Sequence, residues 1–356
     1  MTGRMSQPGG LVKNDAAAHT APVRDARSWS AVLANYRHPS TARSIFEVVV
    51  TVLPFASLWA LASYCAVHGI WWGLLLTIPA AGFLIRMFIL QHDCGHGALF
   101  TRRNANDWTG RMIGVLTLTP YDYWRRTHAI HHATAGNLDK RGIGDVDTLT
   151  VAEYRALSRW GRLRYRLYRN PVVMFGLGPA WLFICQYRLP VGLMRAGVQP
   201  WASTLATNLG IALPVAGLIW LMGLGPFLMV QLPITLMAAT GGVWLFYIQH
   251  QFEETHWSEG DDWTFQHAAL HGSSHYDLPA VLQWITGNIG IHHVHHLSSK
   301  VPFYRLPQVL RDHPQLRDIG RITFRQSLGC IKLVLWDEQA RRLVSFREAR
   351  ALPAPA

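Results

Sequence analysis

The stretch that decides the fold is residues 45–96, IFEVVVTVLPFASLWALASYCAVHGIWWGLLLTIPAAGFLIRMFILQHDCGH. It contains two apolar runs, 45–67 and 70–91, each about 20 residues long, which is enough to cross the ~30 Å hydrocarbon core of a bilayer. Glu47 and Arg86 are the charged residues within the two runs. His68 and Gly69 leave room for a tight turn between them. The stretch therefore predicts a transmembrane helical hairpin that ends in a cluster of polar residues.

A second pair of apolar runs repeats this pattern at 204–222 and 226–249, with a glycine-containing turn between them. Prolines inside these runs are tolerated in membrane helices because neighbouring groups satisfy the freed backbone atoms. A shorter apolar run, 172–187, has arginines on both sides, and we expect it to be interfacial or re-entrant. The predicted fold class is an all-α integral membrane protein with four transmembrane helices in two hairpins, plus cytoplasmic and interfacial helices.

Composition supports a membrane protein over other classes. Half of the 356 residues are hydrophobic and 15% are charged, against about 25% charged in ordinary soluble domains. These values exclude a disordered or fibrous chain, and four scattered cysteines without C-x-x-C spacing exclude a disulfide scaffold. The net charge of +12 is compatible with nucleic acid, but beside four spans it favours a membrane surface. Residues 154–169 alternate arginine with aromatic and apolar residues, which predicts a basic amphipathic helix lying on lipid headgroups.

The placement of cationic residues predicts the orientation. Lysines and arginines lie in the first 44 residues, in 102–195 or from 300 onward, and Arg86 is the one exception. The positive-inside rule then places both termini and the polar segments in the cytoplasm. The expected domains are a mobile cytoplasmic N-terminal tail (1–40), a membrane domain (41–310) and a cytoplasmic C-terminal segment (311–356).

Histidines are concentrated in three short clusters, HDCGH at 92–96, HAIHH at 128–132 and HHVHH at 292–296. Residues three and four apart share one face of a helix, so each cluster presents two or three imidazoles together. His293 points away from the shared face of the third cluster. A single histidine, His250, ends the fourth span at the same boundary as His92. The predicted convergent set comprises His92, His96, His128, His131, His132, His250, His292, His295 and His296.

Such clusters indicate metal binding. At 18 histidines in the chain, two independent HxxHH patterns arise by chance only rarely. Four to six ligands complete one first-row ion, so this set predicts two ions close together. Imidazole ligands suit zinc, copper, iron or nickel. We assign no catalytic residue beyond the metal ligands and no binding site for an organic cofactor.

The clusters and the sequence that flanks them resemble a known family. The stretches are HDCGHGALF (92–100), HAIHHATAGNLDKRGIGDVDTLTVAEY (128–154), IQHQFE (248–253), GSSHYDLP (272–279) and LQWITGNIGIHHVHHLSSKVPFYRL (282–306). With the order of spans over 40–310, this sequence resembles the membrane fatty acid desaturases, and within them the bacterial acyl-lipid desaturases of the Bacillus type. The three-box pattern is highly specific for that superfamily.

The resemblance implies a non-haem di-iron centre that uses O2 to place a cis double bond in a membrane lipid acyl chain. The nine histidines given above would be its ligands. One position departs from the animal stearoyl-CoA branch, where an asparagine four residues before the lone histidine contacts the metal through water; here that position is Phe246. Gln249 and Asn288 are the candidates to replace it.

The chemistry fits this layout because an unactivated methylene offers no acidic proton, so the cofactor must abstract hydrogen while the protein orients the chain and excludes water. Acidic residues should fix the ring tautomers of the ligands, and the candidates are Asp93, Asp145, Asp147 and Glu253. The apolar tunnel for the chain could be lined by the spans and by 244–248.

Electrons must come from an external donor. A ferredoxin-like acidic carrier is expected, and the basic face of the protein would attract it. A hydroxylase of the same superfamily is the alternative function, and a histidine-rich metal transporter is a remote one, since transport ligands belong at mid-span. The double bond position (Δ5, Δ9 or Δ12) is set by tunnel length and is left open by these motifs.

Overall fold

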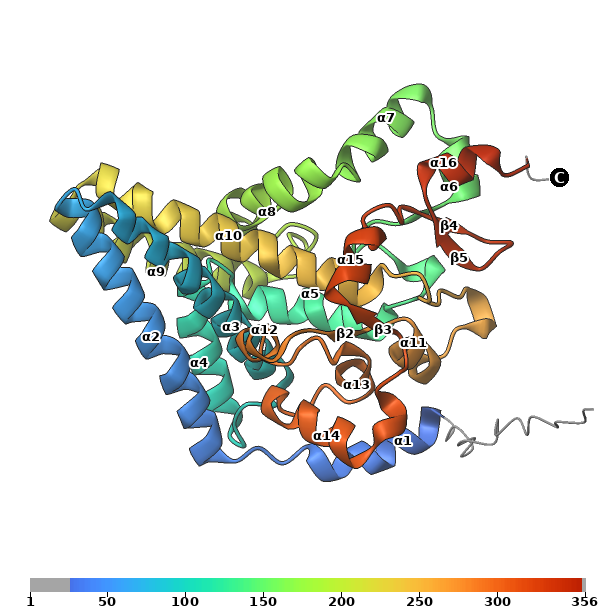
Figure 1. Ribbon diagram of the computed structural model, residues 1–356, viewed down its shortest axis with the longest axis horizontal. Helices are drawn as coiled ribbons and strands as arrows, with labels where there is room; N and C mark the ends of the chain where they lie inside the picture. Colours follow the sequence, from blue (N-terminus) through green and yellow to red (C-terminus); the bar gives the residue numbers. More distant parts are fainter. Residues whose placement is uncertain (1–25, 354–356) are drawn as a thin grey trace, which may run out of the picture.

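The computed structural model describes residues 26–353 (Figure 1). Within this part, four segments are long and apolar enough to cross a membrane. They are α2 (Thr41–Val67), α3 (Thr77–His96, preceded by a 3-10 turn over Trp71–Leu76), α9 (Val198–Met222) and α10 (Leu224–His250). They form two hairpins, which confirms the predicted all-α membrane fold. The hairpin turns lie at the left end of the molecule in Figure 1, and the short helices and strands gather at the opposite end.

Packing of the spans follows their exposure. Helix α3 packs against both α2 and α10, and half of its apolar window is buried. Only 6% of the α9 window is buried, so its apolar side chains face outward, as they can in lipid. Each of the four helices extends beyond its expected apolar run, and α2 and α9 do so at their N-terminal ends. Helix α3 continues to His96, where Gly97 adopts a left-handed φ of 65° and ends it, as glycine commonly does. Helix α10 continues to His250.

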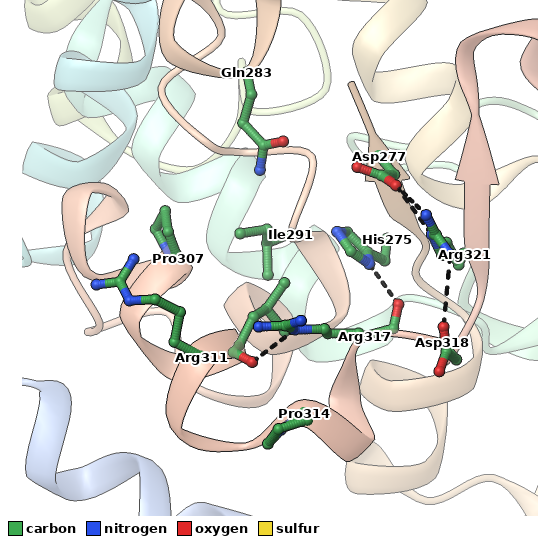
Figure 2. Close-up of a pocket in the computed structure, with 11 residues that line it drawn as sticks. His275, Asp277, Gln283, Ile291, Pro307, Arg311, Pro314, Arg317, Asp318 and Arg321 are labelled. Carbon is green, nitrogen blue, oxygen red and sulfur yellow. Dashed lines mark hydrogen bonds and ion pairs between the residues drawn. The ribbon is translucent and has the colours of Figure 1, made fainter. Parts of the chain in front are cut away.

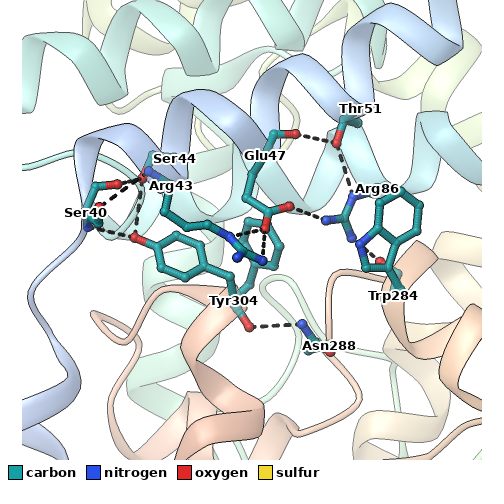
Figure 3. Close-up of polar contacts among 10 residues, drawn as sticks. Ser40, Arg43, Ser44, Glu47, Thr51, Arg86, Trp284, Asn288 and Tyr304 are labelled. Atoms are coloured by element: carbon teal, nitrogen blue, oxygen red, sulfur yellow. Dashed lines mark hydrogen bonds and ion pairs between the residues drawn. The ribbon is translucent and has the colours of Figure 1, made fainter.

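The two charged residues inside the first hairpin pair with each other. Glu47 accepts hydrogen bonds from Arg43, one turn earlier (2.7 Å), and from Arg86 of α3 (Figure 3). Arg86 also donates to the hydroxyl of Thr51 (3.1 Å) and to the backbone carbonyl of Trp284. Because the side chains of Glu47 and Arg86 are each 1% exposed, neither charge could be buried there without the other. The pair also ties Trp284 to the spans.

Short helices and two small sheets form the remainder of the fold. The helices on the histidine-bearing side are α4 (Arg103–Leu116), α5 (Tyr121–Thr134), α11 (Phe265–His271), α12 (Ala280–Ile285), α13 (His292–Leu297) and α14 (Leu306–Asp312). Strand β4 (Leu335–Asp337) pairs with β1 (Leu149–Thr150) in parallel and with β5 (Arg342–Val344) antiparallel. Strand β2 (His275–Asp277) pairs in parallel with β3 (Arg321–Thr323). Helices α15 (Phe324–Cys330) and α16 (Phe346–Ala351) complete the C-terminal part.

The N-terminal segment differs in part from the expected mobile tail of 1–40. Residues 1–25 lie outside the described part of the chain. Helix α1 (Ala26–Leu33) and a 3-10 turn (Ala34–Tyr36) are ordered, and Trp29 and Leu33 are buried in the main core. Two large apolar side chains, spaced four apart, anchor this helix, and the mobility of the tail stays a prediction.

Two other segments differ in detail from expectation. The basic amphipathic helix expected over 154–169 is divided into α6 (Val151–Ala156) and α7 (Arg159–Tyr168), because Ser158 caps the start of α7. The run 172–187 forms helical turns over 173–188, including the short helix α8 (Gly178–Ala180). In Figure 1 α7 and α8 follow one line along one side of the molecule.

The expected domain division is not visible as a gap in the fold. Helix α14 runs across the expected boundary at residue 310, and β3 and β4 pair with strands from the preceding part of the chain. The C-terminal segment therefore packs onto the membrane domain, and the division at 41 and 310 stays a prediction.

Candidate metal centre

Four elements bring the nine predicted histidines together. His92 and His96 lie on the last turns of α3, and His250 is the last residue of α10. The other two clusters lie on α5 and α13, so each has the helical geometry expected from its spacing. Since α3 and α10 pack side by side, their C-terminal ends place His92 and His250 close to each other. The nine side chains form two groups of possible metal ligands.

The first group contains five histidines, whose ligating nitrogens all lie within 4.8 Å of one another: His92, His96, His128, His132 and His295. Nε2 of His128 lies 3.1 Å from Nε2 of both His96 and His132. Nε2 of His132 lies 3.2 Å from that of His295. All three clusters therefore contribute to this group.

The second group contains four buried histidines with the same limit on nitrogen separation: His131, His250, His292 and His296. Nε2 of His250 lies 3.1 Å from Nε2 of both His131 and His292. Nε2 of His292 lies 3.0 Å from that of His296. His132 and His296 stack with ring centroids 4.1 Å apart, so the two groups are immediate neighbours.

The donor set and its spacing fit metal ions. A first-row ion binds imidazole nitrogen at about 2.0–2.1 Å, so two ligands at right angles around it lie about 3.0 Å apart. Neighbouring Nε2 atoms in the groups are 3.0–3.2 Å apart. Nine ring nitrogens facing one another cannot all find hydrogen donors among themselves, because a neutral imidazole has one donor and one acceptor. One cation in each group would satisfy these lone pairs together.

The protein keeps these imidazoles in the neutral form that binds metal. Burial and mutual repulsion hold the pKa of His128, His132, His292, His295 and His296 well below the ordinary value of 6.5. A metal ligand must be deprotonated. The low pKa therefore leaves the lone pairs available at neutral pH.

Groups around the ligands fix three of the rings. Nδ1 of His131 lies 2.5 Å from a carboxylate oxygen of Asp145, and Nδ1 of His250 lies 3.1 Å from the carbonyl of Gly272. These contacts place the hydrogen on Nδ1 and leave Nε2 for a metal. Asp93 lies 3.4 Å from Nδ1 of His92, and its other oxygen accepts the amide of Phe303 at 2.7 Å.

Two of the four acidic candidates therefore contact ligand rings, and two do not. Asp147 and Glu253 are exposed, and their carboxylates have no partner among the described residues. The amide nitrogens of Gln249 and Asn288 donate to the backbone carbonyls of Ile289 and Phe303. Gly272 was not predicted, because a carbonyl contact leaves no trace in the type of residue.

Aromatic rings close the site on two sides. Trp124, one turn before His128, stacks on it with a centroid distance of 4.6 Å and an angle of 15°. Phe246 lies against His131 (5.1 Å) and His250 (5.5 Å). A small pocket opens beside the second group and is lined by Ala135, Gly136, Asp145, Val146, Phe246, His250, Gln251 and Trp257. The aromatic ring at 246 thus adjoins the space next to the ligands.

His293 lies outside both groups, as the helical face predicted. Its Nε2 contacts the backbone carbonyl of Leu316 at 2.8 Å, and it is fully buried. This contact connects α13 to the segment after α14, so we assign His293 a structural role.

Comparison with known proteins decides the family. Residues 69–327 match the family model described as fatty acid desaturase. The chain belongs to the fatty acid desaturase family. It is 44% identical over 321 residues to the fatty acid desaturase of Bacillus subtilis strain 168, covering 90% of this chain and 91% of that one. The resemblance stated from the histidine boxes is confirmed, and the protein is an enzyme of the oxidoreductase class.

More distant relatives are acyl-lipid desaturases. The chain is 28% identical over 301 residues to the sn-1 acyl-lipid omega-3 desaturase (ferredoxin) of Synechocystis, covering 78% of this chain and 76% of the relative. It is 26% identical over 244 residues to the sn-1 oleoyl-lipid 12-desaturase of the same organism, covering 68% and 66%. The four apolar helices and the family together make this desaturase an integral membrane protein.

Proposed function

We propose that the desaturase introduces a cis double bond into a fatty acyl chain of a membrane lipid, using O2 and two iron ions. The observation that carries this proposal is the division of nine histidines into neighbouring groups of five and four at the ends of membrane spans. Two groups of this size suit two six-coordinate or five-coordinate ions with positions left for oxygen. The nine histidines are the proposed ligands.

The balanced reaction removes one hydrogen from each of two adjacent methylenes. With two electrons and two protons from outside, O2 is reduced to two molecules of water and the alkene is formed. Iron, when bound, supplies the redox chemistry that breaks unactivated C–H bonds. The protein chain holds the ligands in their tautomers through Asp145, Asp93 and Gly272 and keeps the site within apolar surroundings.

The acyl chain reaches the site from the membrane side. Phe246 and Trp124 lie beside ligand rings and present apolar surface there. We infer that the chain passes these rings and that their packing excludes water from the reacting carbons. The exposed apolar residues Val172, Leu177 and Trp181 then lie at the lipid interface, as the interfacial interpretation of 172–187 requires.

The electron donor is proposed to be a ferredoxin-like protein in the cytoplasm. Two relatives, from Synechocystis and from Nostoc, carry ferredoxin in their names. The net charge of +12 favours association with an acidic carrier. The positive-inside rule supports an inner-membrane protein with both termini and the histidine groups in the cytoplasm.

The function is tested by the fatty acid profile of a bacterial host with and without this gene, together with a supplied ferredoxin. Gas chromatography–mass spectrometry after derivatisation locates any new double bond and gives the regiospecificity. A new cis alkene supports the proposal. A new hydroxy fatty acid would instead assign the chain to the hydroxylases, and an unchanged profile from iron-loaded protein would contradict an acyl-lipid substrate.

A further inference from the structure

A second pocket, separate from the histidine groups, lies between α12, α14 and the β2–β3 sheet (Figure 2). Its cavity volume is about 600 Å³. Three arginines line it, namely Arg311 at the end of α14, Arg317 after it and Arg321 on β3. No role in metal binding or in the proposed reaction accounts for these arginines.

Two of the three arginines have no acidic partner. Arg321 is paired with Asp277 at 2.6 Å and lies 3.8 Å from Asp318. Arg317 donates through Nε to the carbonyl of Leu310 at 3.0 Å, and its terminal nitrogens have no partner among the described residues. The side chain of Arg311 has no hydrogen bond or ion pair within residues 26–353. The pocket therefore holds two uncompensated guanidinium groups.

Guanidinium groups with free terminal nitrogens bind phosphate oxygens well, because their planar donors match the geometry of the oxyanion. A single carboxylate would leave part of this donor set unused. The two residues flank the 3-10 turn Pro314–Leu316, and Figure 2 shows both among the side chains that line the pocket. Both free guanidinium groups therefore belong to the lining of one pocket.

Hydrogen-bond acceptors stand across the pocket from the free arginines. His275 is buried, and its Nδ1 donates to the carbonyl of Arg317 at 2.6 Å, so the lone pair of the neutral ring is on Nε2, which points into the pocket (Figure 2). Both contacting nitrogens of Arg321 bind Oδ2 of Asp277, which leaves Oδ1 free. A phosphate that carries hydroxyl or ammonium groups would satisfy both sides.

The pocket lies where the spans meet the remainder of the fold. Gln283 of α12 lines it, and the same helix exposes Val281 and Leu282, at 74% and 43%. Trp284, which follows Gln283 in α12, accepts a hydrogen bond from Arg86 of span α3 through its backbone carbonyl. A phospholipid needs this combination, with an apolar surface for its chains beside a basic site for its phosphate.

The pocket is also adjacent to the metal centre along the chain. Ile291 forms part of the pocket wall and directly precedes the ligand His292. His275 bridges to Ile291 through the backbone. A lipid held by its phosphate here is therefore held next to the third histidine cluster.

We propose that this pocket binds the phosphodiester group of a membrane phospholipid through Arg311 and Arg317, and so positions the acyl chain of that lipid at the metal centre. The positioning of the acyl chain rests on the proposed function. The binding of a phosphate group rests on the pocket alone. Free phosphate shares this chemistry, and the experiment separates the two sources.

Binding is measured on the purified, iron-loaded enzyme in detergent, by calorimetry without electron donor. The probes are dihexanoyl phosphatidylglycerol, dihexanoylglycerol, which lacks the phosphate, and inorganic phosphate. The variants are Arg311→Gln and Arg317→Gln, with Arg347→Gln as the matched control, since Arg347 is an exposed arginine of α16 outside the pocket. Because the side chain of Arg311 is exposed and makes no hydrogen bond or ion pair within residues 26–353, Arg311→Gln should leave the fold intact.

The wild type should bind the phosphatidylglycerol at least about tenfold more tightly than dihexanoylglycerol, and each pocket variant should lose about tenfold in affinity for it. Arg347→Gln should bind like the wild type. Equal binding of the two lipids, or unchanged affinity in both pocket variants, would overturn the proposal. Inorganic phosphate binding more tightly than the lipid would assign the pocket to free phosphate and overturn the lipid assignment.

Since binding is read without turnover, this test is independent of the reaction. Wild-type enzyme that binds the lipid in the pocket but produces no double bond would support the pocket and contradict the proposed function. Double-bond formation without phosphate-dependent binding would support the proposed function and contradict the assignment of the pocket.

Discussion

Nε2 of His131 lies 3.1 Å from Nε2 of His250, although the two residues are 119 positions apart in the chain. His131 comes from the middle cluster and His250 from the end of the last span. Their approach joins the lone histidine to the group that also contains His292 and His296. The candidate metal centre is thus assembled by the packing of two spans, α3 and α10, with the short helices α5 and α13, and not by any one motif.

Removal of a ligand should abolish activity without removing the protein from the membrane. In His295→Ala the five-histidine group loses one ligand on α13, and we expect no detectable double-bond formation and loss of iron. The matched variant His293→Ala on the same helix removes a side chain that contacts Leu316. It should lose about 1–3 kcal/mol of stability for the unpartnered carbonyl, yet retain iron and activity for each folded molecule.

The measurements are product analysis and metal content of both variants after purification. Full activity in His295→Ala would remove that residue from the ligand set. An inactive, iron-free His293→Ala protein of normal stability would show that the third cluster uses a different face.

The carboxylate that holds a ligand ring should matter for metal affinity. Asp145→Asn weakens the contact to Nδ1 of His131, and such outer contacts contribute about 10–100-fold in metal affinity. Asp147→Asn is the control, since Asp147 is an exposed carboxylate two residues away. Iron retention is measured against increasing chelator concentration. Identical retention in both variants would contradict the role assigned to Asp145.

The buried ion pair in the first hairpin should support stability. Glu47→Gln leaves Arg86 buried without its carboxylate, which is expected to cost about 3–5 kcal/mol. Arg43→Gln removes the half-exposed partner of the same carboxylate (52% exposed side chain) and should cost less than about 1 kcal/mol. Thermal unfolding in detergent compares them. Similar melting temperatures for both variants would show that the buried pair is dispensable.

Acid should release the metal and destabilise the fold together. The pKa of His292, His295 and His296 is held well below the ordinary 6.5. Between that value and the lower folded pKa, the unfolded chain binds more protons than the folded chain, so stability falls as the pH falls. Above about pH 6.5 these groups are neutral in both states and contribute no pH dependence.

Iron content and unfolding temperature between pH 8 and pH 4.5 test this relation. Both should be constant at the alkaline end and decline below about pH 6.5. A decline that is complete at pH 7.5 would mean that the histidines are not held neutral by burial.

The spans and the histidine-bearing helical faces were predictable from the sequence because their signals are local. An apolar run such as 45–67 specifies a span by its length, and histidines at 292, 295 and 296 share a face wherever that helix lies. The division of His131 from its neighbour His132 into separate groups was not predictable. It depends on where α10 places His250, which is a property of packing between distant segments.

Other features lacked any local signal. The pairing of Glu47 with Arg86 joins two charges that are 39 residues apart, and spacing alone does not show that their helices pack in that register. The pocket arginines lie in a C-terminal segment without periodicity, and they converge because β3 returns to pair with β2. Trp29 likewise lies in an otherwise polar N-terminal stretch, where no pattern in the neighbouring residues indicates its burial in the main core.

The measurement that tests the central claim most directly is the number of iron atoms per chain in the purified enzyme, counted by mass spectrometry against protein concentration. The account predicts two irons per chain in the wild type, with desaturation lost when they are removed and restored when iron is returned. Full desaturase activity with one iron or fewer per chain, or with zinc alone, would contradict the account.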